Sequence, residues 1–153
     1  DSGKTTLVVD LIPELRRLGL RVGTIKHHPH DIDVDLPGKD TWKHRRAGAD
    51  GTILSTPSSI SMVRNAGHDH SPAELARLLA DMDIVLAEGY KNADVPKIEV
   101  HRDGLGRSPL CLDDPRLLAL VTEAEFPAAV PRFHPGDARG LVRFLVGLFG
   151  LRP

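Results

Sequence analysis

Apolar residues recur along this chain with two spacings, one typical of amphipathic helices and one of buried strands. Over residues 4–18 they fall on one face of a helix, and a similar spacing returns after residues 71 and 137. Short apolar runs separate these segments, at residues 20–26, 83–91, 96–101 and 117–122. Helices that alternate with apolar strands predict a three-layer α/β fold with a mostly parallel sheet.

Start signals support two of the helices. Ser71 is a suitable N-cap, with a proline next and Glu74 three residues after the cap, and apolar positions continue to Met82. Asp137 is a suitable cap for the last helix. The residues of that helix predicted to face inward are Leu141, Val142, Leu145, Val146 and Phe149. The strand at residues 83–91 is continuously apolar until it ends in charge, so we expect it to be buried on both faces.

The middle of the chain has a different pattern. A helix is predicted over residues 39–47, ending at Gly48. Residues 52–54 and 59–63 have the pattern of two strands joined across Thr-Pro-Ser, which predicts a β-hairpin. We therefore expect a hairpin extension on an otherwise parallel α/β fold. The basic run at residues 43–46 is either a solvated helix face or a contact for a phosphorylated ligand.

Composition narrows the class of protein. The chain has 153 residues, enough for a buried core, and we expect a single domain over residues 1–153. Its formal net charge of −1 gives no basic footprint for nucleic acid. The one cysteine, Cys111, excludes an intramolecular disulfide and suits a reducing compartment. No apolar run approaches the ~18 residues of a membrane span, so we expect a cytoplasmic protein with neither a nucleic-acid nor a membrane partner.

The first chemical motif lies at the start of the chain. Residues 2–6, Ser-Gly-Lys-Thr-Thr, match the second half of the phosphate-binding loop G-x-x-x-x-G-K-[ST]. In that loop Gly3 allows the backbone to approach a phosphate, Lys4 reaches the β- and γ-phosphates, and the Thr5 hydroxyl holds Mg²⁺. The helix that follows directs its positive end at the same anion. Nucleotide binding is therefore predicted, and we expect the first strand and the first part of the loop to precede residue 1.

A second candidate group follows the strand at residues 83–91. In parallel α/β folds, ligands bind beyond the carboxyl ends of the strands. Glu88 lies at such an end, where the acidic residue of a nucleotide-binding fold holds Mg²⁺ or orients a water molecule. A solvent-exposed carboxylate is the alternative interpretation. Because the preceding strand is so apolar, we predict the functional role.

A polar loop after the strand at residues 20–26 is the most unusual segment. Residues 27–40 contain three histidines and four aspartates. Asp31, Asp33 and Asp35 alternate, so an extended backbone places them on one side. Three interpretations remain open: a Zn²⁺ or Ni²⁺ site formed by the histidines, a polar surface loop, or a switch segment that closes over the γ-phosphate. The switch is favoured because the loop follows a strand beside the phosphate site, and the aspartates suit Mg²⁺ better than the histidines do.

Several motifs together resemble the family of molybdopterin-guanine dinucleotide biosynthesis adapter proteins, called MobB. They are Ser-Gly-Lys-Thr-Thr-Leu at residues 2–7, Gly-Thr-Ile-Lys-His-His at 23–28, His-Asp-Ile-Asp and Asp-Leu-Pro-Gly-Lys-Asp within 30–40, Arg-Ala-Gly-Ala at 46–49, Glu-Gly-Tyr-Lys at 88–91 and Pro-Lys-Ile-Glu-Val at 96–100. The resemblance covers about residues 1–102, and its Lys-His to Pro-Gly-Lys-Asp block is far more specific than the phosphate loop. One departure is Glu123, which stands where the family carries an aspartate and whose carboxylate reaches further.

The resemblance implies a P-loop protein that binds GTP and Mg²⁺ and has low GTPase activity. Its partner is expected to be the nucleotidyltransferase that joins GMP to molybdopterin in molybdenum cofactor biosynthesis, with molybdopterin as a further ligand to consider. A homodimer is also implied, which the hairpin would serve through edge pairing. We assign catalysis to Asp33 and Glu88, and magnesium binding to Thr5, Asp33 and Glu88. Nucleotide binding is assigned to Ser2, Gly3, Lys4, Thr5, Thr6, Lys26, His28, Asp40 and Gly89.

Two other functions would use the same phosphate loop. A small-molecule kinase needs an acceptor pocket and a base, for which His28 or Asp33 is available. A metallochaperone GTPase would use the histidines to load a metal. The sequence shows no obvious arginine finger placed in cis, a feature worth about 10³–10⁵ in rate, so an adapter of this kind is expected to hydrolyse GTP slowly.

Overall fold

The structure of the protein, a computed structural model, describes residues 3–102 and 108–152. The chain divides into two compact units, the first made of Asp1–His27 and Ser71–Pro153 and the second of His28–His70. The single domain over residues 1–153 stays a prediction. No helix in the described parts of the chain is long and apolar enough to cross a membrane.

The first unit alternates helices with strands, as the apolar pattern predicts. Its elements are α1 (Lys4–Arg17), β1 (Val22–Lys26), α3 (Pro72–Ala76), the 3-10 helix η1 (Arg77–Leu79), β4 (Ile84–Glu88), β5 (Lys97–Val100), β6 (Leu117–Val121), β7 (Arg132–Phe133) and α4 (Ala138–Phe149). The sequence pattern does not indicate β7, because a strand of two residues is too short to show a period.

The described strand pairs of the first unit are parallel. β1 pairs with β4, and β5, β6 and β7 form a separate three-stranded sheet in that order. The predicted α/β class with mostly parallel pairing is therefore confirmed. The expectation that the apolar strand is buried on both faces is wrong, because the residues of β4 are partly exposed. Among the described residues β4 pairs with β1 alone, so its other edge has no neighbouring strand.

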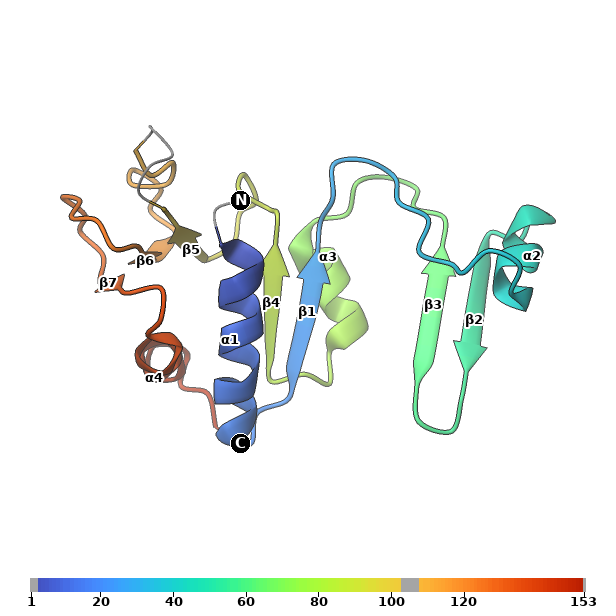
Figure 1. The fold of residues 1–153 in the computed structure, drawn as a ribbon, viewed down its shortest axis with the longest axis horizontal. Helices are drawn as coiled ribbons and strands as arrows, with labels where there is room; N and C mark the ends of the chain where they lie inside the picture. Colours follow the sequence, from blue (N-terminus) through green and yellow to red (C-terminus); the bar gives the residue numbers. More distant parts are fainter. Residues whose placement is uncertain (1–2, 103–107, 153) are drawn as a thin grey trace. The chain divides into compact units, whose positions relative to one another are not determined.

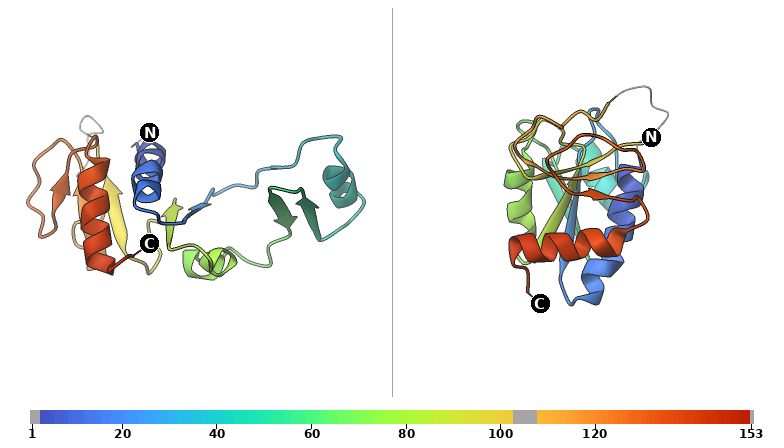
Figure 2. Two further views of the ribbon diagram at one scale, coloured as in Figure 1. Left: turned by 90° about the horizontal axis from the view of Figure 1, so that it is seen from below. Right: turned by 90° about the vertical axis from the view of Figure 1, so that its left-hand side faces the viewer.

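Helices cover both faces of the β1–β4 pair, as a three-layer fold requires. Figure 2 (right) shows the two strands between α1, in blue, and α3, in light green, and both helices contact β1. Gly23 of β1 is the point of close approach to η1. A Cβ placed on Gly23 would lie 2.9 Å from Cδ1 of Leu79 and 3.1 Å from Cγ of Met82. The glycine therefore allows the helical layer to pack directly on the strand.

The core of the first unit lies between α1, β6 and α4. α1 stands beside β4 (Figure 1), and α4 runs across α1 and contacts it (Figure 2). Burial of each large apolar side chain contributes about 1.5–3 kcal/mol. This packing fixes the direction of α1 and so the place of its N-terminus. The buried residues of the core are Leu7, Leu11, Leu15, Leu20, Ala119, Val121, Leu141, Val142 and Leu145.

Both predicted helix caps are confirmed. The Ser71 side chain accepts a hydrogen bond from the Glu74 N–H, and the Glu74 carboxylate accepts one from the Ser71 N–H at 2.8 Å. Asp137 accepts a hydrogen bond from the N–H of Gly140 at 2.8 Å at the start of α4. These local contacts form because a helix leaves its first N–H groups without backbone partners.

Two predicted details of the helices are wrong. α3 ends at Ala76 and continues only as η1, rather than running to Met82. The reason is that the chain has to enter β4, and the Asp83 N–H already donates to the Arg21 carbonyl at 2.9 Å. Phe149 is 47% exposed instead of facing inward. Phe149 is the last residue of α4, and the buried residues of this helix, Leu141, Val142 and Leu145, all lie nearer its start.

The second unit consists of a polar loop, a short helix and a hairpin. α2 spans Asp40–Arg46, and β2 (Gly51–Ser55) pairs antiparallel with β3 (Ile60–Arg64). The predicted hairpin is therefore confirmed. α2 contacts β2, and Thr52 of β2 is buried. One face of the hairpin is thus partly covered within this unit.

Candidate functional site

Three side chains meet at the carboxyl end of the β1–β4 pair. In the parallel register Lys26, the last residue of β1, lies directly beside Glu88, the last residue of β4. The Lys26 ammonium donates to Glu88 Oε1 and forms an ion pair with it. The Thr5 hydroxyl, from the first turn of α1, donates to the same oxygen at 2.9 Å. Parallel pairing therefore joins Lys26 and Glu88, which are 62 positions apart, and the placement of α1 adds Thr5, which is 83 positions from Glu88.

The Thr5 and Glu88 oxygens have the spacing of two ligands of one metal ion. Octahedral Mg²⁺ holds its oxygen ligands at about 2.0–2.1 Å, which places neighbouring ligand oxygens about 2.9 Å apart. The distance from Thr5 Oγ1 to Glu88 Oε1 is 2.9 Å. Carboxylate and hydroxyl oxygens are also donors that suit Mg²⁺. The pair therefore fits a magnesium ion, and Lys26 already brings positive charge to the same carboxylate.

The surroundings keep Glu88 ionised. Burial of its side chain, which is 10% exposed, raises the pKa, but hydrogen bonds from Lys26 and Thr5 act in the opposite direction. The charges of Lys26 and Lys4 add to them, so that the pKa of Glu88 lies below the ordinary value for a glutamate. The carboxylate is therefore negative at neutral pH, as a metal ligand or a water-orienting group has to be.

From Gly3 onwards, the start of α1 has features that a phosphate-binding loop requires. Gly3 is the N-cap and has a φ of 82°, a left-handed conformation that glycine adopts without strain. Its carbonyl accepts the first helical hydrogen bond, from the Leu7 N–H at 3.0 Å. Lys4, Thr5 and Thr6 are exposed in the first turn, which contains no acidic residue. An exposed helix N-terminus of this kind favours an anion.

Gly89 follows Glu88 at the point where the chain leaves β4. Its φ is 103°, and a Cβ placed on it would lie 2.7 Å from the carbonyl oxygen of His27. The His27 N–H donates to the Glu88 carbonyl at 2.9 Å, and the His27 ring lies 4.8 Å from that of Tyr90. Glycine is therefore required for the close approach of the two loops that follow β1 and β4. Its predicted contact with a nucleotide stays a prediction.

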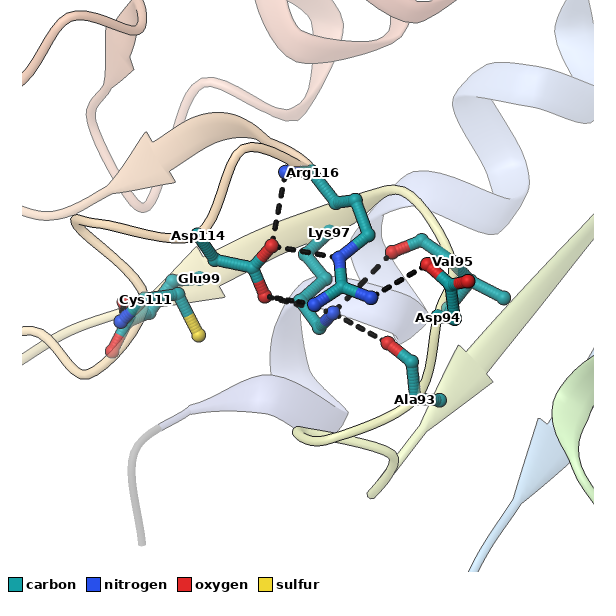
Figure 3. A network of polar contacts seen from close by, with 8 residues as sticks. All are labelled: Ala93, Asp94, Val95, Lys97, Glu99, Cys111, Asp114 and Arg116. Atoms are coloured by element: carbon teal, nitrogen blue, oxygen red, sulfur yellow. Dashed lines mark hydrogen bonds and ion pairs between the residues drawn. The ribbon is translucent and has the colours of Figure 1, made fainter.

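A buried ammonium group fixes the loop that runs from Gly89 to β5 (Figure 3). Lys97 is 8% exposed, and its Nζ donates to the carbonyls of Ala93 and Val95. A carboxylate oxygen of Asp114 lies 3.0 Å from the same Nζ. Burial of a charged group is tolerated when oxygens surround it in this way. The loop after the candidate site is thereby tied to β5 and to the turn before β6.

Arg116 extends this network (Figure 3). Its Nε donates to Asp114 at 2.7 Å and its Nη1 donates to Asp94 at 2.6 Å. Hydrogen bonds from the side chain and backbone of Arg116, and then from Lys97, hold the pKa of Asp114 well below its ordinary value. The stabilising contribution of Asp114 is therefore present above the ordinary carboxyl pKa. It is lost as the pH falls through that value towards the lowered one.

The acidic residues of the polar loop form a small network inside the second unit. Asp33 accepts a hydrogen bond from the Asp35 N–H at 3.1 Å, and one of its oxygens lies 3.7 Å from Arg45 Nη1. Arg45 Nη1 also pairs with Asp35 at 3.5 Å, and Asp35 is the more buried of the two carboxylates. Asp33 is therefore the more accessible acid of this loop, and its assigned role as a catalytic and magnesium-binding residue stays a prediction.

Two further predicted residues belong to the same unit. His28 Nδ1 lies 3.0 Å from the carbonyl oxygen of His30, within hydrogen-bond distance. Asp40 is the first residue of α2 and lies 3.4 Å from the ammonium of Lys43. Neither contact excludes a role in nucleotide binding, and both assignments stay predictions. Ser2, which is also assigned to the nucleotide, lies outside the described residues.

Two further groups lie just past the carboxyl ends of β5 and β6, and the first of them is close to the phosphate loop. Arg102 lies two residues beyond β5, and a Cβ placed on Gly3 would be 3.2 Å from both its Nε and its Nη2. The sequence analysis did not single out Arg102, although its position just past an apolar strand is a signal that could have found it. Glu123 follows β6, and its Oε1 lies 3.3 Å from Nε2 of His134.

A family model matches most of the chain. Its description is MobB, Molybdopterin guanine dinucleotide synthesis protein B, and it covers residues 1–123. The match includes the phosphate loop, the polar loop, Glu88 and Arg102, as well as the strands β1 to β6.

Curated proteins of two bacteria are similar to this chain over most of their length. The molybdopterin-guanine dinucleotide biosynthesis adapter protein of Escherichia coli is 36% identical over 151 residues, which is 95% of this chain and 86% of that protein. The protein of the same description from Haemophilus influenzae is 37% identical over 141 residues, 86% of this chain and 73% of the relative.

Solved structures agree with this result. A crystal structure of molybdopterin-guanine biosynthesis protein B is 26% identical, with a TM-score of 0.72 and coverage of 98% of this chain and 93% of that one. The structure of a MobB homologue from Bacillus stearothermophilus is 24% identical in sequence and has a TM-score of 0.68. The match covers 97% of this chain and 90% of the homologue, and it supports the same fold. In matched length, sequence identity and fold alike, this chain belongs to the MobB family.

Proposed function

We propose that the protein is a GTP-binding adapter in molybdopterin guanine dinucleotide biosynthesis, assisting the nucleotidyltransferase that joins GMP to molybdopterin. The observation that carries the proposal is the pair of oxygens from Thr5 and Glu88, 2.9 Å apart at the N-terminus of α1. The adapter role rests on the described role of the relatives from Escherichia coli and Haemophilus influenzae. The proposal includes the cytoplasmic location expected from the sequence, and molybdopterin stays a further ligand to test.

Each residue of the phosphate loop has a separate task in this proposal. The backbone around Gly3 receives the phosphates, and the Lys4 ammonium reaches their β- and γ-oxygens. Thr5 and Glu88 hold Mg²⁺, which neutralises negative charge on the phosphate oxygens when it is bound. Lys26 pairs with the same carboxylate and would keep it oriented towards Thr5, so a bound metal ion would share Glu88 with this ammonium.

Specificity for guanine is the part of the proposal that depends on β6. Glu123 follows this strand and presents a carboxylate, the group that accepts hydrogen bonds from the N–H donors of a guanine base. Adenine offers no matching pair of donors at that edge. The longer reach of glutamate relative to aspartate requires the base to lie slightly further from the strand end.

A nucleotide competition assay tests the proposal. GTP and GDP are expected to displace a fluorescent GTP analogue at concentrations at least about tenfold lower than ATP does. The reason is that a site whose acceptors match the N–H donors of guanine discriminates against adenine, which lacks them. Mg²⁺ should strengthen the binding of GTP. The longest available form of the chain is the appropriate sample. Equal competition by ATP would contradict guanine selectivity, and no competition by any nucleotide would contradict the phosphate site as well.

We further propose that the hairpin of the second unit forms a homodimer contact. In the antiparallel register Ile53 lies opposite Met62, and Ile60 lies on the same face. These three side chains are 64%, 45% and 74% exposed. In the described chain the hairpin has two strands only, so its outer edges are also open to pairing. A second copy of the hairpin offers both a matching edge and a matching apolar face, which is why an isologous contact fits.

The dimer contact is tested by placing a charge on this face. Ile60→Lys is expected to convert a dimer into a monomer in light scattering coupled to size-exclusion chromatography, because an unpaired ammonium would be buried in the contact. Ser58→Lys, in the turn of the same hairpin, adds the same charge outside the strand ladder and should stay dimeric. If Ile60→Lys is folded and remains a dimer, the apolar face of the hairpin is not the dimer contact.

A further inference from the structure

The side chain of Arg102 lies over the glycine of the phosphate loop. Both Nε and Nη2 would be 3.2 Å from a Cβ placed on Gly3, so one edge of the guanidinium faces this glycine. That edge carries two parallel N–H donors, the arrangement that binds two oxygens of one phosphate. Because Gly3 has no side chain, the guanidinium can lie directly against the backbone of the phosphate loop.

The charges around Arg102 require a negative partner. The positive end of α1 begins at Gly3, Lys4 stands in its first turn, and the first turn contains no acidic side chain. A cation at a helix N-terminus is unfavourable, because it faces the positive end of the helix dipole. Within the described residues, Arg102 donates no hydrogen bond to a carboxylate or a carbonyl. Arg102, Lys4 and the helix terminus thus favour an additional anion here, beyond Glu88, whose carboxylate already interacts with the Lys4 charge.

A small cavity lies at the same place. It has a volume of about 50 Å³ and is lined by Gly3, Thr6 and Arg102 on its polar side and by Leu7, Val100 and Val121 among others on its apolar side. Pockets that hold a complete small molecule measure about 300–1,000 Å³. This cavity is therefore too small for a purine base, and the polar groups at its edge, from Thr6 and Arg102, are what a single charged group of a larger ligand could contact.

We propose that Arg102 is a phosphate-binding residue of this site and donates to the β-phosphate of the bound nucleotide from its place beside the loop at Gly3. The inference rests on the proposed nucleotide binding. The β-phosphate is assigned because the loop backbone cradles the α- and β-phosphates, whereas Lys4 reaches on to the γ-phosphate. An arginine at the β-phosphate contacts substrate and transition state equally, so it strengthens binding without accelerating hydrolysis. This role agrees with the slow GTPase expected of an adapter.

Calorimetric titration with GTP, GDP and GMP tests the assignment. Arg102→Gln is expected to raise the Kd for GTP and for GDP about tenfold or more, the loss that follows from removing a charge-assisted hydrogen bond. The Kd for GMP, which lacks a β-phosphate, should change less than about twofold. Arg102→Lys keeps the charge but loses the paired donors. Its Kd for GTP and GDP should therefore lie between that of the wild type and that of Arg102→Gln. The matched control is Arg143→Gln, which removes an exposed arginine from α4.

The outcomes separate this inference from the proposed function. Hydrolysis at saturating GTP should stay within about threefold of the wild-type rate in Arg102→Gln, a result that a distorted site would not give. Unchanged Kd values for GTP and GDP, with binding still lost in Lys4→Ala, would overturn the role of Arg102 and leave nucleotide binding intact. An equal loss for GMP would overturn the β-phosphate assignment. A wild-type protein that binds no GTP would overturn both proposals.

Discussion

Replacing Lys4 by alanine is expected to weaken GTP binding by about ten- to 150-fold, which corresponds to the 1.5–3 kcal/mol of hydrogen bonds to a charged group. Lys4 lies in the exposed first turn of α1, where its ammonium can reach the β- and γ-phosphates. Titration calorimetry at one fixed salt and Mg²⁺ concentration measures the effect, because exposed charges are screened by salt.

The control for Lys4→Ala has to lose a positive charge elsewhere on the same unit. Arg143→Ala meets this condition, since Arg143 is an exposed residue of α4. Its affinity for GTP should stay within about twofold of the wild type, because exposed charges separated by more than ~10 Å hardly interact at physiological salt. Thermal unfolding of both variants shows whether they are folded. Wild-type affinity in a folded Lys4→Ala protein would refute the phosphate role.

Glu88→Gln is expected to slow GTP hydrolysis about 100-fold while the Kd for GTP changes much less, in the range found for removal of a positioned acid or base. The amide keeps the size of the carboxylate and can still accept a hydrogen bond from Thr5. It loses the negative charge that holds Mg²⁺ or orients water. Single-turnover hydrolysis with enzyme in excess measures the rate, because the wild-type reaction itself is slow.

Glu14→Gln serves as the matched substitution. Glu14 lies on α1. Like Glu88 it pairs with a cation, since one of its carboxylate oxygens lies 3.1 Å from Arg17. It lies near the opposite end of α1 from the phosphate loop. Its loss should leave hydrolysis unchanged. If Glu88→Gln hydrolyses GTP as fast as Glu14→Gln does, Glu88 is a structural partner of Lys26 and not a catalytic residue.

Much of the fold follows from local patterns. The helical spacing of Leu7, Leu11 and Leu15 marks the buried side of α1, and the cap residues Ser71 and Asp137 mark helix starts correctly. Such features are encoded within a few neighbouring residues, so they are accessible without tertiary information. The early end of α3 is different, because it depends on where the chain has to enter β4.

The sequence by itself identified the candidate phosphate loop at Gly3, Lys4 and Thr5, because this motif is contiguous and is recognised from neighbouring residues alone. It also indicated Glu88, as an acid at the end of an apolar strand. The family resemblance came from the same kind of contiguous motif, and the comparisons confirm it.

Tertiary structure alone decided which groups surround that loop. Parallel pairing of β1 and β4 sets Lys26 against Glu88, and the packing of α1 on the core brings Thr5 to the same oxygen. The position of Arg102 over Gly3 depends on where β5 lies relative to α1. Contacts between residues tens of positions apart are set by register and packing, and no periodicity within one segment of the chain encodes them.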